Sequence, residues 1–547
     1  MQKTLEIVLR KYKIVFVLVL LTLMLLAWHN KFVQDDAFIS FRYAKNFAEG
    51  IGLVFNKGER VEGYTNFLWT MLMSLSFKLG FDPVLFSYYA GITFFVISLL
   101  FTYKIAEIAF DFWEENSSKL LSLLVVILLG TNYTFSAYAT GGLETQMQTA
   151  FVTASVFFFL NVLYKKKESY LNLFFISLLL IISVLVRPDS LVFVFLIFFG
   201  FFYLREERNT ANKILVVQRF LVLLVPFLTV LIAYLLWKLF YYGDILPNSF
   251  YTKVGGIESI PAGLIYIGLF FSSYWLFPIL ILFPFYLNKF VKKNNTTIKF
   301  LSFIIVVWLL YLVKIGGDFM EFRFLVPILP FLFVVIVWTI YALIEEKKVR
   351  YALIVIIILG SIYHKVTFHY LHGIESIKNL AGHLYDENQN WIEVGKRLHE
   401  LFPNRNVTIA VSAAGAVPFY SELPAVDMYG INDSEIAKNG IIIGNRPGHQ
   451  KFSTIGYLYD KRVNLLIGEP FVVKKSFIDC SITEKMFEDF FKYRLNDLQL
   501  KKPRLLRTSL DSGYDLYFLY LIKNTRVDSL INEGRIRVIQ QEKFSAD

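Results

Sequence analysis

Charged residues are scarce in this sequence. Asp, Glu, Lys and Arg together make up 18% of the 547 residues, whereas a soluble globular domain carries about 25%. Hydrophobic residues make up 56%, and so few charged side chains cannot cover a soluble core of that size. The composition therefore excludes a single-domain soluble enzyme, a nucleic-acid-binding protein and a disordered protein.

Cysteine and several common motifs are also missing. Cys480 is the single cysteine, so a disulfide within the chain is excluded. The sequence has no P-loop and no GxSxG motif. The stretch Ala413-Ala414-Gly415-Ala416 follows a predicted strand but is not GxGxxG. The sequence therefore gives little support to nucleotide binding.

Long apolar runs, in contrast, are abundant. About 20 apolar residues span a bilayer as a helix, and the net charge of +11 is carried by short basic runs between such segments. The first run ends in Ala27-Trp28-His29, which offers no small-residue cleavage site, so we interpret it as a retained anchor. We predict about eleven transmembrane helices, at residues 12–28, 84–103, 119–134, 144–164, 170–186, 190–204, 214–241, 263–288, 299–315, 324–344 and 349–366.

The basic runs predict the orientation of the chain, because Lys and Arg are enriched in cytoplasmic loops. With these spans, every basic cluster falls on the side of the N-terminus. The clusters are Lys3, Arg10, Lys11 and Lys13; Lys165, Lys166 and Lys167; Arg205, Arg208 and Lys213; Lys289, Lys292 and Lys293; and Lys347, Lys348 and Arg350. We therefore predict a multi-pass protein of the bacterial inner membrane with a cytoplasmic N-terminus and an extracytoplasmic C-terminal domain.

The composition changes near residue 367. Apolar runs shorten to strand length, at 407–411, 464–467 and 516–520. Between 388 and 402 the apolar residues share one helical face: Trp391, Val394, Leu398 and Leu401. The predicted fold is a polytopic α-helical membrane domain at 1–366 followed by a C-terminal extracytoplasmic α/β domain at 367–547.

The first external loop, residues 29–82, begins with two adjacent carboxylates, Asp35 and Asp36. An apolar stripe follows them: Phe38, Phe41, Ala44 and Ala48. It predicts an amphipathic helix lying on the bilayer surface. One aspartate can cap this helix, which accounts for one carboxylate only. The alternative is a general base at a membrane-interface active site, where burial and a like charge raise a carboxylate pKa.

Further outward-facing polar residues complete a candidate site. Arg187, Arg323 and Lys253 suit a phosphate, Arg by a bidentate fork and Lys as a point charge; a structural pair of Arg187 with Asp189 is the alternative. Acid beside base at one membrane face fits a lipid-phosphate donor and a hydroxyl acceptor, and ionisable residues at membrane depth are costly. Candidates for the substrate groove, some of which equally suit scaffold turns, are Arg42, Tyr43, Glu62, Tyr64, Asn66, Glu144, Asn248 and Asp318.

Four outer-domain residues, Asp427, Asn432, Asp433 and His449, are candidates for binding an acceptor glycan or covering the site. We favour the alternative that they are turn residues of the α/β domain. Metal binding has weak support. Asp35 and Asp36 are compatible with Mg²⁺ or Mn²⁺. The histidines near the domain junction match no closed zinc pattern; they are His364, His369, His372 and His383.

Several of these segments resemble the GT-C superfamily of integral-membrane glycosyltransferases, and most of all the terminal β-(1→2)-arabinofuranosyltransferases and their bacterial relatives. The long block at 35–69 is the most specific part of this resemblance. It contains Asp-Asp at 35–36, Ile-Ser-Phe-Arg-Tyr-Ala at 39–44, Gly-Leu-Val-Phe-Asn at 52–56 and Glu-Arg-Val-Glu-Gly-Tyr-Thr-Asn-Phe-Leu-Trp at 59–69. Shorter similar pieces lie at 246–253, 316–320, 418–421, 427–433 and 447–451.

The resemblance implies an enzyme that takes a sugar, such as the pentofuranose arabinose, from a polyprenyl-phosphate donor. The acceptor would be a cell-envelope glycan or glycolipid at the outer face of the cytoplasmic membrane. By resemblance the base is Asp35, with Asp36 as neighbour or alternate. Direct displacement would invert the anomeric centre, and chemistry and topology point to Arg187 and Arg323 for stabilising the departing phosphate.

Two other functions are compatible with such a chain: a lipid-linked sugar transporter or flippase, and a non-catalytic envelope assembly protein. A transporter typically carries internal repeats and ionisable groups at mid-membrane. This sequence has no evident repeat, and its charges gather at helix mouths on one side. Lys238 and Lys314 lie near span ends, where they can snorkel. The oligomeric state is left open.

Overall fold

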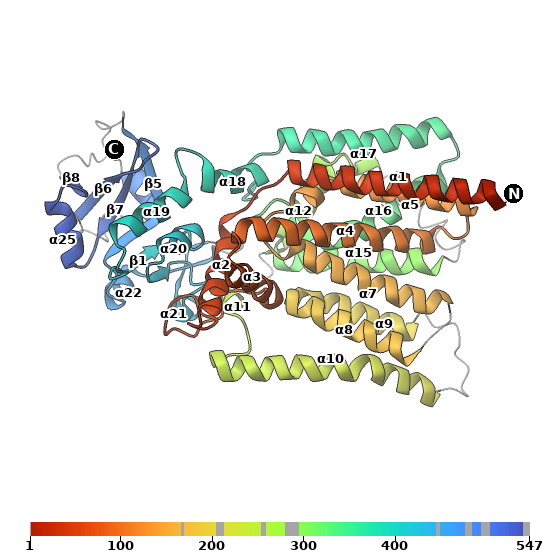
Figure 1. Ribbon diagram of the computed structural model, residues 1–547, viewed down its shortest axis with the longest axis horizontal. Helices are drawn as coiled ribbons and strands as arrows, with labels where there is room; N and C mark the ends of the chain where they lie inside the picture. The colour runs from red at the N-terminus through yellow and green to blue at the C-terminus, as the bar shows by residue number, and fades with distance from the viewer. Residues whose placement is uncertain are drawn as a thin grey trace.

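The computed structural model places the membrane helices side by side, with the C-terminal domain at one end of the bundle (Figure 1). Lys253, Cys480 and residues 279–288 of the predicted span 263–288 lie outside the described residues. The structure describes residues 2–165, 169–203, 213–252, 259–278, 295–444, 449–475, 484–493 and 504–539.

Helices occupy the described part of every predicted span. Six are long and apolar enough to cross a membrane by length and composition: α4 (Pro83–Ala109), α7 (Thr145–Lys165), α10 (Lys213–Tyr242), α15 (Thr296–Ile315), α16 (Leu329–Leu343) with the 3-10 turn η4 (Arg323–Ile328) before it, and α17 (Lys347–Thr367). Helices also lie at the other predicted spans: α1 (Gln2–His29), α5 (Glu115–Thr131), α8 (Tyr170–Val186), α9 (Leu191–Tyr203) and α12 (Ile260–Ser273). The chain is a polytopic membrane protein, and the total of eleven spans stays a prediction.

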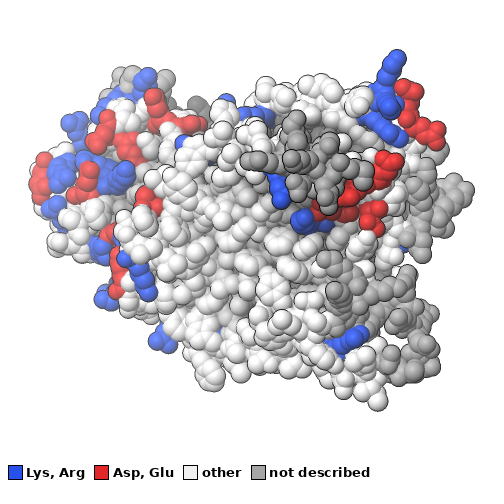
Figure 2. All heavy atoms as spheres, turned by 45° about the vertical axis from the view of Figure 1, so that its right-hand side comes forward, with Lys and Arg blue, Asp and Glu red and all other residues white. Residues whose placement is uncertain are grey.

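Burial separates the inner helices of the bundle from the outer ones. In the η4–α16 span 89% of the apolar stretch is buried inside the protein, against 11% in α10. Both stretches are apolar all round, which suits a helix surrounded by other helices as well as one facing lipid. Figure 1 shows α10 along one flank of the bundle, and Figure 2 shows charged side chains at the two ends with a broad uncharged band between them.

The C-terminal domain, residues 367–547, is called the outer domain here after its predicted side of the membrane. It is built on a six-stranded mixed sheet. The strand order is β2-β1-β5-β7-β6-β8, with β1 parallel to β2 and β5 and the other pairs antiparallel. The strands are β1 (Ile409–Val411), β2 (Ala425–Asp427), β5 (Leu465–Lys474), β6 (Arg504–Ser509), β7 (Tyr514–Tyr520) and β8 (Arg537–Ile539). In a separate two-stranded sheet, β3 (Ile441–Ile442) pairs antiparallel with β4 (Lys451–Phe452). The predicted strands at 407–411, 464–467 and 516–520 are therefore confirmed.

Helices cover this sheet. They are α18 (Ile377–Tyr385), α19 (Trp391–Leu401), α20 (Ala416–Ser421), α21 (Ser434–Asn439), α22 (Ile455–Asp460), α23 (Glu484–Phe491) and α25 (Thr525–Asn532). The predicted helix at 388–402 is confirmed as α19, which buries the predicted face against the domain core: Trp391, Val394, Leu398 and Leu401.

The helix predicted after Asp35 is present as α2 (Asp35–Ala48), but its predicted position on the bilayer surface is wrong. Phe38 and Phe41 are fully buried, and the Phe38 ring lies 5.4 Å from the rings of both Phe419 and Tyr420 in α20. The other helix of the loop, α3 (Phe67–Leu79), also packs against α2. The apolar face of α2 is therefore covered by protein, and the first external loop shares a hydrophobic core with the outer domain.

Candidate functional site

A cavity of about 1130 Å³ lies between the ends of the membrane helices and the outer domain. The first external loop and the loops at the ends of α8 and α15 supply one wall, and outer-domain loops supply the other. Of the residues predicted from sequence, eight line it: Asp35, Asp36, Tyr64, Asn66, Glu144, Arg187, Asp318 and Arg323, joined by Asp427 and His449 from the outer domain. The fold therefore gathers most of the predicted site into one place.

The two adjacent aspartates have different surroundings. Neither caps its own helix, because the N-cap position of α2 is Gln34. Asp35 instead accepts hydrogen bonds from the backbone amides of Gly415, at 3.0 Å, and Ala416, at 2.7 Å. Both carboxylate oxygens of Asp35 are thus engaged by the start of α20, which is a poor arrangement for a general base.

Asp36 is half-buried and makes no hydrogen bond or ion pair with any residue that the structure describes. Burial raises the pKa of Asp36 to about 7; the negative charges of Asp35, Asp318 and Asp427 act in the same direction, and Arg323 opposes them. A carboxylate with a pKa near neutrality suits proton abstraction. The geometry therefore favours Asp36 over Asp35 as the base.

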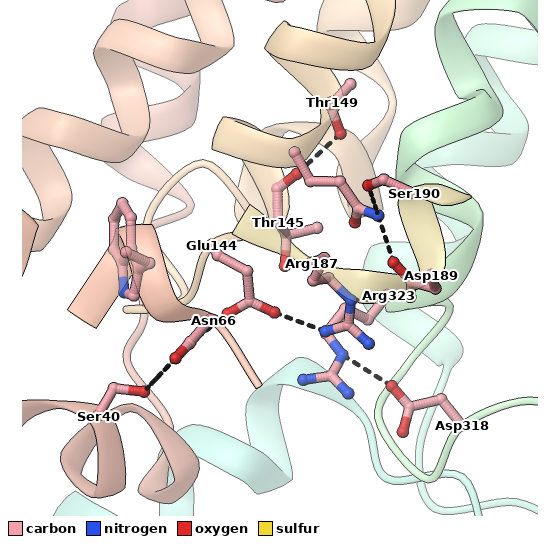
Figure 3. A network of polar contacts seen from close by, with 12 residues as sticks. Ser40, Asn66, Glu144, Thr145, Thr149, Arg187, Asp189, Ser190, Asp318 and Arg323 are labelled. Atoms are coloured by element: carbon pink, nitrogen blue, oxygen red, sulfur yellow. Dashed lines mark hydrogen bonds and ion pairs between the residues drawn. The ribbon is translucent and has the colours of Figure 1, made fainter. Parts of the chain in front are cut away.

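A chain of polar contacts joins several residues that line the cavity (Figure 3). Asn66 donates to Glu144 at 2.7 Å and exchanges a hydrogen bond with Ser40 at 3.1 Å. Glu144 in turn lies 2.5 Å from Arg187, whose Nε also donates to Asp189 at 2.8 Å. The structural Arg187–Asp189 pair anticipated from sequence is confirmed, and Glu144 extends it.

Local sequence explains how Arg187 enters the cavity. A residue before proline is disfavoured in helical conformation, and α8 ends at Val186, one residue before Arg187-Pro188. Arg187 is extended, with φ −155° and ψ 124°. Burial would lower its pKa, but the charges of Asp189 and Glu144 outweigh burial and raise the pKa of Arg187. Arg187 therefore remains a cation beside the cavity.

Arg323 is the second arginine of this wall. Its Nε donates to Asp318 at 2.8 Å, and both guanidiniums contact the Phe324 ring, at 4.8 Å from Arg187 and 4.9 Å from Arg323. Within the described ranges, the two terminal nitrogens of Arg323 have no hydrogen-bond partner. They remain available to an anion in the cavity, which suits a phosphate.

Lys314 was missed as a site residue, because the sequence suggested only that it snorkels at the end of a span. The helix α15 ends at Ile315 and is capped by Gly316, whose φ of 84° is the left-handed conformation that glycine adopts freely. This end leaves Lys314 exposed and lining the cavity. Its ammonium forms no ion pair in the described part of the chain. The sequence does contain a signal for this role: Lys314 lies in the last turn of a predicted span, just before Gly316-Gly317-Asp318.

Four residues predicted for the substrate groove do not line the cavity: Arg42, Tyr43, Glu62 and Asn248. Arg42 is buried and donates to the backbone oxygens of Phe55 and Leu423, each at 2.8 Å, and of Pro418. Tyr43 is buried as well, and its hydroxyl accepts from the Gly63 amide at 2.9 Å. Both residues therefore support the fold.

The other two residues are Glu62 and Asn248. They attach the end of α10 to the first external loop and the segment after α10 to the outer domain. Glu62 forms a buried ion pair with Lys238 at 2.7 Å, so Lys238 does not snorkel as predicted. Burial raises the pKa of Glu62 to about 7, although Lys238 opposes the shift. Asn248 opens the short helix α11 (Asn248–Tyr251) and donates to the backbone oxygens of Gly430, at 2.6 Å, and Ile431, at 3.1 Å.

The outer-domain candidates divide into two groups. Asn432 and Asp433 are turn residues, as the favoured interpretation predicted: Asn432 donates to Asp427 at 3.0 Å, and Asp433 caps α21. Asp427 and His449 line the cavity. Burial raises the pKa of Asp427 to about 6, and the His449 ring packs against the rings of Phe319 and Tyr429.

The donor set for a metal ion is incomplete where the structure describes the chain. No three His, Cys, Asp or Glu side chains come together there in an arrangement that holds a cation. Asp35, one of the two predicted ligands, is already engaged by backbone amides. His364 and His383 are paired with Glu321 and Glu375, each at 2.8 Å. Asp35 and Asp36 therefore do not form such a cation site in this part of the chain.

The architecture of the chain matches solved structures of the GT-C fold. It shares the fold of ArnT from Cupriavidus metallidurans bound to undecaprenyl phosphate, at 10% identity and a TM-score of 0.51 over 93% of this chain and 98% of that one. It also shares the fold of the oligosaccharyltransferase of Archaeoglobus fulgidus in the apo form, at 11% identity and a TM-score of 0.51 over 92% and 74% of the two chains.

Sequence comparison confirms the predicted resemblance. The chain is 25% identical over 334 residues to a terminal β-(1→2)-arabinofuranosyltransferase of Mycobacterium tuberculosis, covering 55% of this chain and 51% of that protein. It is 25% identical over 407 residues to the Corynebacterium glutamicum protein of the same name, covering 68% and 56%. The chain thus spans about half the length of the curated relatives it matches.

Two family models match separate parts of the chain. The model of the Alg9-like mannosyltransferase family matches residues 262–404, from α12 to the end of α19. A model described as a domain of unknown function (DUF8728) matches residues 377–517, which include most of the outer domain.

Proposed function

We propose that the protein is a glycosyltransferase that moves a sugar from a polyprenyl-phosphate donor to a hydroxyl of a cell-envelope glycan or glycolipid. The reaction takes place in the cavity at the outer face of a bacterial cytoplasmic membrane, with the N-terminus inside and the outer domain outside. The names of the curated relatives make a pentofuranose such as arabinose the first sugar to test. The single observation that carries the proposal is that the Asp36 carboxylate and the terminal nitrogens of Arg323, none of which has a partner among the described residues, line the same cavity.

The reaction is a single inverting displacement. The acceptor oxygen attacks the anomeric carbon of the donor, and its proton passes to the Asp36 carboxylate. The bond between the anomeric carbon and the phosphate oxygen breaks, and its electron pair leaves with the lipid phosphate. This route needs one base and stabilisation of the charge on the departing phosphate.

The donor's phosphate fits the side of the cavity that carries Arg323, Arg187 and Lys314. Arg323 can direct two N–H groups at one phosphate, whereas Lys314 acts as a point charge nearer the exposed end of α15. Glu144, Asp189 and Asp318 fix the orientation of the two arginines. The negative charges of these carboxylates also offset the repulsion between the two guanidiniums, so the two arginines can stay close together before the phosphate binds.

The test is a transfer assay on purified protein in nanodiscs. It uses a panel of radiolabelled polyprenyl-phosphate sugars, with membrane glycan extract as acceptor, and compares wild type with Asp36→Asn and Arg323→Gln. A parallel assay measures whether undecaprenyl phosphate raises the thermal midpoint of unfolding, and whether Arg323→Gln removes that shift.

Transfer by wild type that collapses in Asp36→Asn supports both the reaction and its base. Movement of labelled lipid across vesicles without transfer of the sugar would instead indicate a flippase. Protein that neither transfers sugar nor is stabilised by the lipid phosphate contradicts the proposal and leaves the assembly role.

A further inference from the structure

The contact between α2 and α20 bears directly on the position of the proposed base. The Asp35 carboxylate accepts hydrogen bonds from the backbone amides of Gly415 and Ala416, and Asp36 is the next residue in the chain. Charge-assisted hydrogen bonds of this kind are about twice as strong as neutral ones. The backbone on one side of Asp36 is therefore fixed to the outer domain, although Asp36 itself points into the cavity.

Gly415 allows this contact because it has no side chain. A Cβ at position 415 would lie 1.9 Å from the backbone oxygen of Asp35 and 2.6 Å from its carbonyl carbon. These two atoms belong to the peptide group that joins Asp35 to Asp36. Any side chain at position 415 would therefore push the peptide that carries the proposed base.

The rest of α2 is joined to α20 in a way that makes the two helices one unit. Arg42 donates to the carbonyl oxygens of Pro418 and, at 2.8 Å, of Leu423. Lys45 forms an ion pair with Glu422. Together with the buried rings between the helices, these contacts join α2 to the outer domain along much of its length.

We propose that Asp35, Gly415 and Ala416 form a positioning clamp through which the outer domain sets the place of Asp36 in the cavity. The inference rests on the proposed function, since it concerns the base of that reaction. It gives the outer domain a part in the transfer step itself, in addition to any part in holding acceptor. Asp35 and Gly415 are then positioning residues, and Asp36 is the group that meets the substrate.

The first test compares Gly415→Ala with Gly456→Ala. Gly456 lies in α22 of the same domain, and the nearest atom to a Cβ there is 4.0 Å away, so this control adds the same methyl without a clash. We expect Gly415→Ala to lower kcat by about 10²-fold with an unchanged KM for the donor, because a shift of about 1 Å in a reacting group has that effect. Gly456→Ala should keep wild-type kcat.

A double-variant cycle separates positioning from general damage. If Gly415 acts only through Asp36, Gly415→Ala has almost no effect on the residual transfer of Asp36→Asn. A second loss of about 10²-fold in that background would overturn the clamp, because it would show damage that does not pass through Asp36. So would a Gly415→Ala variant that keeps kcat within about threefold of wild type.

The clamp also has a readout that needs no activity. Amide hydrogen exchange at Gly415 and Ala416 should be slow in the wild type and at least about tenfold faster in Asp35→Asn, the factor expected when a hydrogen bond to a charged group is lost. Unchanged exchange in Asp35→Asn contradicts the clamp even if Gly415→Ala fails to fold. If the wild type transfers no sugar, exchange still decides the contact, so failure of the proposed function and failure of the clamp are distinguishable.

Discussion

Both walls of the cavity carry charged side chains, but the walls differ in whether these side chains have polar partners within the protein. On the wall formed by the first external loop and the membrane helices, Asp36, Lys314 and the terminal nitrogens of Arg323 have no polar partner among the described residues. On the outer-domain wall, Asp427 accepts three hydrogen bonds from Tyr429 and Asn432 at 2.9–3.0 Å. Free polar groups in a shielded cavity can act on a ligand, whereas satisfied groups fix a shape. We therefore assign the chemistry to the first wall and support to the second.

The largest expected effect is that of Asp36→Asn. It keeps the size of the side chain but removes the base, and we expect kcat to fall by about 10²- to 10⁴-fold, the contribution of general base catalysis. The measurement is the initial rate of sugar transfer at saturating donor. Asp427→Asn is the comparison on the other wall. An equal loss in Asp427→Asn, with both variants folded, would remove the distinction between the walls.

Arg323→Gln is next in magnitude. The change removes the guanidinium that faces the departing phosphate, and we expect kcat to fall by about 10²- to 10³-fold, as when one preorganised donor is lost from a transition state. The double variant Arg323→Gln with Asp318→Asn controls for the carboxylate left without its partner. Transfer restored by the double variant would show that Arg323 only neutralises Asp318.

The pH dependence of kcat tests the role of Asp36 without a mutation. Asp36 acts as a base only when deprotonated, and its pKa is raised to about 7. Activity should therefore fall as the pH drops through about 7, by about tenfold for each pH unit below that value. A profile of kcat against pH that stays flat down to pH 5 would contradict Asp36 as the base.

Lys314→Ala is expected to act on binding of the donor. Lys314 is exposed, and exposed charge pairs contribute about 0.2–1 kcal/mol, so KM for the donor should rise no more than about fivefold with little change in kcat. The difference should shrink at high salt because an exposed charge is screened. Titration of the donor at two ionic strengths measures it, and a loss in kcat would place Lys314 in the chemical step.

His449→Ala should have the smallest effect. The ring packs against Phe319 and Tyr429 on the outer-domain wall, and we expect transfer rates within about threefold of wild type. Rates with a panel of acceptor glycans measure it. A large loss with one acceptor alone would assign the outer-domain wall a role in choosing the acceptor.

Much of the fold followed from periodicity and composition. Apolar run length predicted the helices of the membrane part, and a single apolar face predicted α19. The position of α2 could not be predicted, because an apolar stripe has the same pattern whether lipid or protein covers it. Phe38 meets Phe419 and Tyr420 across about 380 residues of chain, a separation over which one sequence carries no pairing signal.

The sequence by itself determined that this protein is a multi-pass membrane protein with a C-terminal α/β domain, since run length and composition are local properties. It also identified ten residues that line the cavity, because ionisable groups at the helix mouths are costly unless they are used. Only the tertiary structure distinguishes the surroundings of Asp35 from those of Asp36. Their difference comes from the amides of Gly415 and Ala416, which the fold brings to one carboxylate and not to its neighbour.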